Sequence, residues 1–156
     1  MVQRAEKMNI TSIRSVSTGS DLVARLTTLY QGFTVEQLDQ LDSVYRDDIR
    51  FYDPFHQIAG LAELKAYFAR LYLNVDHCSF RFETPQMLSD RAFLAWTMQL
   101  QHPKLNRRRM FSVEGLSEVR FSDRIYYHRD YFDGADMLYG RLPLLGMLIG
   151  AIRKRL

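Results

Sequence analysis

Two side chains near the end of the chain combine residue types that exchange protons. His128 and Asp130 lie two residues apart in the segment from Ile125 to Phe132, which is typical of a strand. Because successive side chains of a strand point to opposite faces, these two share a face. An imidazole and a carboxylate on one face form an acid–base pair. The alternative is a satisfied structural contact with Tyr or Arg neighbours, since a buried carboxylate needs partners.

The elements that must position this pair begin with three predicted helices. The spacing of apolar residues predicts the first over residues 21–31, with Gly32 at its end. A capping box that starts at Thr34 opens the second, which we expect to close at Asp47. The third follows Gly60. Its apolar side carries Leu61, Leu64, Tyr67, Phe68, Leu71 and Tyr72.

Strands are predicted after the third helix, followed by one final helix over residues 135–155. We expect strands around residues 80–83 and over 91–101, 110–121 and 125–132, besides a short one at 49–52. Helices followed by an antiparallel meander predict an α+β fold. In it, the three N-terminal helices pack against one face of a strongly bent, mainly antiparallel sheet, which leaves a concave surface for a ligand.

The composition suggests what lines that surface. Aromatic residues make up 13% of the chain and Met occurs seven times, more bulky apolar surface than a small core needs. The excess either fills the core or forms the wall of an apolar pocket. We expect a pocket wall made of Phe51, Phe68, Tyr72, Trp96, Met98 and Phe121. The polar residues on the same predicted faces are Asp53, Ser117, His128 and Asp130.

Charge and cysteine usage exclude several classes of function. The net charge of +3 is too small to imply nucleic-acid binding, and we interpret the basic run at residues 107–109 as a solvated turn. The single cysteine, Cys78, excludes an internal disulfide and a Cys-based zinc site. The four His are scattered without metal-ligand spacing. We therefore expect a cytoplasmic protein without metal or cofactor.

Both ends of the sequence differ from the middle. Residues 1–20 lack the apolar stretch of a signal peptide, and their composition predicts a flexible extension to a domain over 21–140. In the tail, 141–156, the apolar run 142–152 is followed by three basic residues. That run is too short to span a bilayer, which takes about 20 residues. It either packs on the domain or docks on a partner or a membrane surface.

Several strings, in this order and spacing, resemble the nuclear-transport-factor-2-like superfamily. This superfamily includes ketosteroid isomerases, limonene epoxide hydrolases and SnoaL-type polyketide cyclases. The strings cover residues 44–54, Gly60, Trp96, residues 115–117 with Phe121, and residues 125–133. The resemblance spans about residues 21–140 and implies a cone of curved sheet and helices around an apolar cavity. The fold hosts many chemistries and several non-enzymes, so it leaves the function open.

The resemblance implies roles for single residues. Asp53 matches the general base of ketosteroid isomerases, although Asp-Pro is also a common turn junction, and Ser117 occupies the position of their strand donor. Asp130 matches a water-activating Asp of limonene epoxide hydrolases, whose two companions fall at Trp96 and Met98. SnoaL-type cyclases use His and Asp in the cavity, as His128 and Asp130 would here. The resemblance also implies a homodimer.

Two hypotheses of different classes follow. In the first, the chain is a SnoaL-like enzyme that acts by acid–base catalysis, as an isomerase, cyclase or hydrolase, on an apolar or polycyclic small molecule. His128 and Asp130 form the acid–base pair, and Asp53 assists or orients. In the second, the chain holds an apolar ligand without catalysis or serves as an accessory protein.

Overall fold

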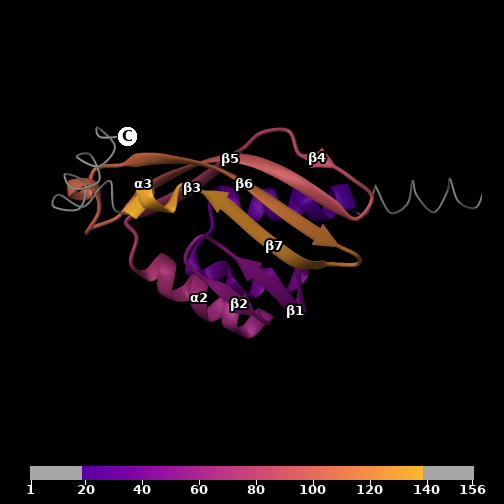
Figure 1. The fold of residues 1–156 in the computed structure, drawn as a ribbon. Coiled ribbons are helices and arrows are strands. Elements are labelled where there is room, and N and C mark those ends of the chain that lie inside the picture. Colours follow the sequence, from indigo (N-terminus) through magenta and orange to yellow (C-terminus); the bar gives the residue numbers. More distant parts are fainter. Residues whose placement is uncertain (1–18, 139–156) are drawn as a thin grey trace, which may run out of the picture.

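The computed structural model of the chain describes residues 19–138 (Figure 1). The predicted extension, apart from residues 19 and 20, and the tail at 141–156 lie outside the described residues. Residues 19 and 20 are already helical, so the first helix reaches further toward the N-terminus than the expected start at residue 21. Within residues 19–138, no helix is long and apolar enough to cross a membrane.

The second predicted helix is shorter than expected. After the helical residues 19–31, a 3-10 helix, η1, covers Val35–Ser43 and begins with the predicted capping box of Thr34 and Gln37. The predicted end at Asp47 is wrong, because strand β1 starts at Tyr45 and covers Tyr45–Tyr52. The carbonyl of Val44 accepts the backbone N–H of Ile125 at 2.9 Å. The start of β1 is thus bound by a distant strand, which no local pattern reveals.

The other elements follow the expected order of helix and strands. They are β2 Gln57–Ala59, α2 Leu61–Leu73, β3 His77–Phe82, β4 Gln86–Met87, β5 Arg91–Gln101, η2 Asn106–Arg108, β6 Phe111–Phe121, β7 Ile125–Phe132 and α3 Gly134–Leu138. The short strands β2 and β4 were not expected from the sequence. Of the predicted final helix, α3 is the part that lies within the described residues.

One seven-stranded sheet carries the fold. The strand order is β2-β1-β7-β6-β5-β3, with β4 paired to β5. Every strand pair is antiparallel except β1 with β7. The sheet arches over α2 and the N-terminal helix (Figure 1). The α+β class and the curved, mainly antiparallel sheet are therefore confirmed.

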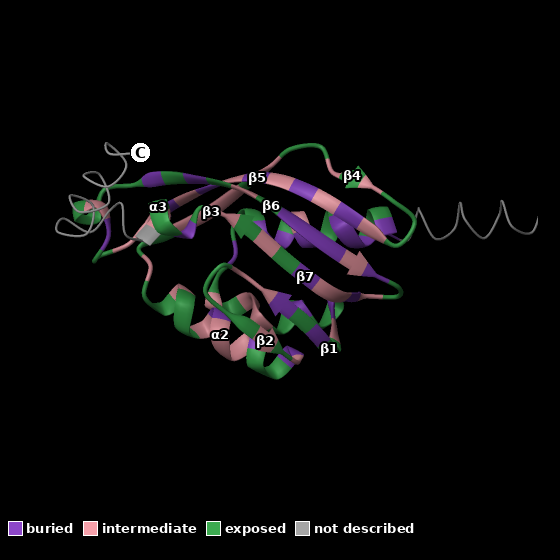
Figure 2. Cartoon of the chain, viewed as in Figure 1, coloured by how far each residue is buried: buried purple, intermediate pink, exposed green. Residues whose placement is uncertain are grey.

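The inner face of the sheet is apolar along β5 and polar at one point of β7. Side chains of β5 alternate in burial over its whole length, as the sequence predicts (Figure 2). Cross-strand register places Leu94, Ser117 and Asp130 in one row, and Trp96, Gly115 and Phe132 in the next. The short polar row therefore lies directly beside aromatic side chains on the concave face.

Candidate functional site

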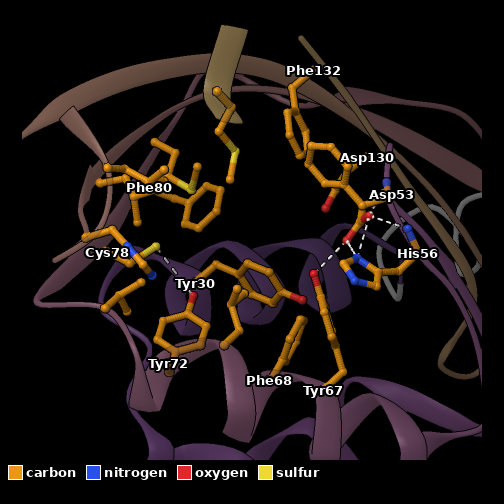
Figure 3. Close-up of a pocket in the computed structure, with 18 of the residues that line it drawn as sticks. Tyr30, Asp53, His56, Tyr67, Phe68, Tyr72, Cys78, Phe80, Asp130 and Phe132 are labelled. Carbon is orange, nitrogen blue, oxygen red and sulfur yellow. Dashed lines mark hydrogen bonds and ion pairs between the residues drawn. The ribbon is translucent and has the colours of Figure 1, made fainter. Parts of the chain in front are cut away.

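An apolar cavity of about 590 Å³ lies between the concave face of the sheet and α2 (Figure 3). Pockets for small molecules span about 300–1,000 Å³, so the cavity could hold a ring-sized ligand. The expected wall residues Phe51, Phe68, Tyr72, Trp96 and Met98 all line it. Its polar side chains are Tyr30, Asp53, His56, Tyr67, Tyr72, Cys78, His102, Lys104 and Asp130.

Asp130 presents one free oxygen to this cavity. Its Oδ1 accepts hydrogen bonds from His128 Nε2 at 2.9 Å and from Ser117 Oγ at 2.5 Å. Ser117 in turn accepts the indole N–H of Trp96 at 2.8 Å. Asp130 Oδ2 has no hydrogen-bond partner within residues 19–138, and the side chain is 17% exposed. The protein therefore orients Asp130 through one oxygen and leaves the other available to a ligand.

His128 lies behind Asp130 in a chain of hydrogen bonds. The side chain is 2% exposed, and its Nδ1 is 2.6 Å from the hydroxyl of Tyr45. That hydroxyl is 2.8 Å from the hydroxyl of Tyr30. An ionised carboxylate can only accept, so His128 Nε2 carries the hydrogen and Nδ1 accepts from Tyr45, which accepts from Tyr30. Burial raises the pKa of both tyrosines, which keeps their protons in the chain.

Asp53 is surrounded by donors. Its Oδ1 accepts the backbone N–H groups of Phe55 and His56, both at 2.7 Å. Its Oδ2 accepts the hydroxyl of Tyr67 at 2.6 Å. The side chain is 6% exposed and lines the cavity. Asp53 therefore both stabilises the turn and lines the cavity, two roles that the sequence analysis treats as alternatives.

A second imidazole, His56, reaches the cavity through Asp53. Its Nδ1 lies 3.1 Å and 3.2 Å from the two Asp53 oxygens, so Nδ1 carries the hydrogen. The side chain is half exposed, and Nε2 has no hydrogen-bond partner in the described part of the chain. Asp53, His56, Tyr67 and Asp130 gather at one side of the cavity (Figure 3).

Sequence reasoning misses two members of this cluster, His56 and Tyr67, and also misses the Tyr45 hydroxyl that binds His128 behind it. His56 lies three residues after Asp53, across a proline turn, and that spacing is a usable signal. Tyr67 was placed on the apolar side of its helix without a role, and its hydroxyl binds Asp53. The apolar spacing predicts Tyr45 near the end of the second helix, whereas the structure makes it the first residue of β1. Burial raises the pKa of Tyr67, so its hydroxyl keeps its proton as a donor.

Three expected site residues lie behind the cavity wall. Ser117 and His128 contact Asp130 without lining the cavity themselves. Phe121 is 4% exposed and belongs to the larger core cluster. A side chain added at Gly19 would overlap its ring, so Phe121 packs against the first helix rather than a ligand. Strand alternation correctly places the Phe121 side chain on the inner face of the sheet. The cavity, however, does not extend that far along β6.

The free thiol of Cys78 also lines the cavity. Burial raises its pKa to about 11, so the thiol stays protonated and is a poor nucleophile. Within residues 19–138, no three His, Cys, Asp or Glu side chains gather closely enough to hold a metal ion. The reactive groups of the site are thus the carboxylates and the imidazoles.

Gly115 allows Trp96 to lie flat across β6. A methyl group at position 115 would overlap the Trp96 indole, whereas one at Gly32 would meet no atom within 4 Å. We expect Gly115→Ala to lower the free energy of unfolding by about 1–3 kcal/mol, because overpacking displaces a buried ring. Urea unfolding measures this, and the emission of Trp96, the single tryptophan, reports whether its bond to Ser117 is lost. Gly32→Ala is the control; equal stability of the two variants would contradict the prediction.

Comparisons with known proteins identify the family to which this fold and cavity belong. The sequence profile of the SnoaL-like domain matches residues 26–128, more than half of the chain. The chain therefore belongs to the SnoaL-like family, within the nuclear-transport-factor-2-like superfamily that the sequence resembled. No curated protein matches the sequence.

Solved structures share the fold at low sequence identity. An NTF2-like protein of unknown function from Burkholderia pseudomallei is 15% identical, with a TM-score of 0.68, over 78% of this chain and 95% of that one. A protein from Jannaschia sp. CCS1 with the provisional name SnoaL-like polyketide cyclase is 14% identical, with a TM-score of 0.65, over 75% and 86%. TerC, co-crystallised with polyporic acid, is 15% identical, with a TM-score of 0.61, over 72% and 91%.

Proposed function

We propose that this chain catalyses proton transfer at a carbon next to a carbonyl group in an apolar, ring-sized molecule. The observation that carries the proposal is Asp130 Oδ2, which has no hydrogen-bond partner within residues 19–138 and faces the same cavity as the Asp53–His56 pair. Isomerases and cyclases that react through an enolate both begin with such a transfer. The wall of the cavity is otherwise almost entirely apolar, which suits a substrate with few polar groups.

Asp130 is the proton acceptor in this proposal. The C–H bond of the substrate breaks, the proton moves to Asp130 Oδ2, and the electron pair enters the carbonyl group as an enolate. His128 and Ser117 hold Oδ1, so Oδ2 is oriented toward the substrate in advance. His128 is a positioning residue here, because it acts on the substrate through Asp130.

His56 acts on the oxygen that becomes negative. Asp53 accepts from Nδ1 and thereby directs Nε2 of His56 away from the turn. When the ring carries a proton on both nitrogens, Nε2–H can donate to the enolate oxygen. Asp53 itself already accepts several protein donors through both oxygens, so orientation is the role that its contacts favour.

The experiment that tests the proposal uses a bicyclic ketone, 2-tetralone, in D₂O. Wild-type protein is expected to exchange the hydrogens next to the carbonyl faster than buffer does, as followed by the loss of their NMR signal. The rate should saturate with ketone concentration. Ketone that binds, shown by saturation-transfer NMR, but exchanges at the buffer rate would contradict the proposal.

Binding without catalysis is the second candidate function. The full set of donors around Asp53 favours it, because that carboxylate is satisfied without any ligand. Among proteins of the same fold, TerC was crystallised with polyporic acid and the Jannaschia protein bears a cyclase name, so the fold suits small molecules with either role. Mass spectrometry of a ligand that co-purifies from cells, before and after prolonged incubation with the protein, separates the two: an unchanged ligand supports binding alone.

A further inference from the structure

The cavity has a second polar end, which proton transfer does not use. His102 and Lys104 line it, and both belong to the loop between β5 and β6. Cys78 pairs with Leu100 across the sheet, so the loop starts at the Cys78 end of the cavity. Figure 3 shows Cys78 on the side opposite Asp53 and His56. The cavity therefore has carboxylates at one end and basic side chains at the other.

Among the described residues, no carboxylate neutralises the charge of Lys104. The loop 102–110 contains four basic residues with Lys or Arg side chains and no acidic one. The neighbouring carboxylate, Asp76, is bound by Arg108 at 2.9 Å and 3.2 Å. No carboxylate within residues 19–138 forms an ion pair with Lys104. Lys104 is exposed and lines this end of the cavity, so an ammonium group without a counter-ion there attracts an anion.

His102 supplies a donor beside this ammonium. Its Nδ1 accepts the backbone N–H of Lys104 at 3.0 Å, so in the neutral ring the hydrogen resides on Nε2. Nε2 has no partner in the part of the chain that the structure describes. An N–H donor and an ammonium group at one end of a cavity match the two oxygens of a carboxylate.

Contacts of its own fix the backbone of the loop that carries His102 and Lys104. Leu105 is buried against the smaller core cluster, and its N–H binds the carbonyl of His102 at 3.2 Å. Asn106, Arg107 and Arg108 have φ values of 49°, 53° and 63°, a left-handed turn that costs energy for non-glycine residues. Such a turn persists where surrounding contacts determine it, and it often marks a ligand-binding segment.

We propose that the ligand of this cavity is an apolar, ring-sized molecule that carries a carboxylate, bound by Lys104 Nζ and by Nε2–H of His102. The inference rests on the proposed function in that it names the substrate class of the same cavity. Asp53 and Asp130 repel an anion, so the ligand enters in one orientation, with its carboxylate at the loop and its reacting carbon at Asp130.

The test compares two fluorescent probes that differ in one group, 1-pyrenebutanoate and 1-pyrenebutanol. Titration of the whole chain at low salt should give a dissociation constant about tenfold lower for the acid, the size expected of a charge-assisted hydrogen bond. Added salt should weaken binding of the acid and leave the alcohol unaffected. Lys104→Gln should remove most of the preference, and Lys104→Arg should keep it.

Arg109→Gln is the matched control, because it removes the same charge from the same loop at a side chain that does not line the cavity. It should keep the preference for the acid. Equal binding of acid and alcohol, or a preference that Lys104→Gln and Arg109→Gln change alike, would overturn the inference and leave proton transfer by Asp130 intact. Failure of both probes to bind would overturn the cavity as a ligand site, and the proposed function with it.

Discussion

Asp130→Asn is expected to slow the exchange of 2-tetralone hydrogens by a factor of about 10²–10⁴, the usual contribution of a general base. Asn has nearly the same shape as Asp. Its Oδ1 can still accept from His128 Nε2 and Ser117 Oγ, which places an NH₂ group where Oδ2 faced the cavity. The amide does not take up a proton near neutral pH. The variant thus keeps the contacts of the site and loses only the proton acceptor.

Two measurements keep this result specific to the site. The free energy of unfolding of Asp130→Asn, from urea titration, shows whether the fold is retained. Asp39→Asn removes a carboxylate that is 97% exposed and does not line the cavity, so its exchange rate should equal that of the wild type. Equal rates in Asp130→Asn and wild type would remove Asp130 from the role of proton acceptor.

Asp53→Asn is expected to behave differently from Asp130→Asn. Asn at position 53 can keep the two backbone N–H bonds on Oδ1. Its NH₂ group, however, replaces the Oδ2 that accepts from the Tyr67 hydroxyl and from His56 Nδ1, so both contacts are disturbed. We therefore expect Asp53→Asn to affect stability and exchange together. A pure loss of rate at constant stability is expected of Asp130→Asn, and this difference follows from the number of protein donors that each carboxylate accepts.

Local periodicity could predict one half of the candidate site. The alternation of a strand places His128 and Asp130 on one face, and the structure brings their side chains within 2.9 Å. The same alternation gave the apolar inner face of β5, including Trp96 and Met98. These features depend on neighbours two residues apart, so they require no knowledge of the partners across the sheet.

The other half depends on contacts between distant segments. Tyr45 continues the apolar spacing of the preceding helix, and only the parallel pairing of β1 with β7 makes it a strand residue next to His128. The Tyr67 hydroxyl reaches Asp53 because α2 packs against β1, which helix periodicity does not specify. Phe121 lies on the same face of the sheet as the cavity but beyond its end. Strand alternation predicts the face on which a side chain lies, and it does not predict how far a pocket extends.

Alkaline pH is expected to destabilise the protein steeply, because the hydrogen-bond chain behind Asp130 contains two buried tyrosines. Tyr45 is fully buried and Tyr30 is 7% exposed. Burial raises the pKa of both above their ordinary value of 10.0. Below about pH 10 both states keep the tyrosine protons, and the stabilisation is fully present. As the pH rises further, the unfolded chain releases protons that the folded chain retains, so the free energy of unfolding falls.

The expected slope can be assigned to single residues. Each buried tyrosine lowers the free energy of unfolding by up to about 1.4 kcal/mol per pH unit above pH 10, until its pKa in the folded state is reached. Urea unfolding at several alkaline pH values measures the slope. Lysine and arginine side chains also titrate there, so the informative quantity is the difference between variants rather than the slope of the wild type alone.

Tyr45→Phe should lower stability at neutral pH and reduce the alkaline slope. Its loss leaves the Tyr30 hydroxyl and His128 Nδ1 without their partner, which costs about 1–3 kcal/mol. One ionisable group fewer then takes part above pH 10, so the stabilities of variant and wild type should converge as the pH rises. Tyr131→Phe, at an exposed tyrosine, should leave the slope unchanged. Parallel curves for wild type and Tyr45→Phe would show that Tyr45 does not hold its proton in the folded protein, and the assigned direction of the hydrogen bonds to His128 would then be wrong.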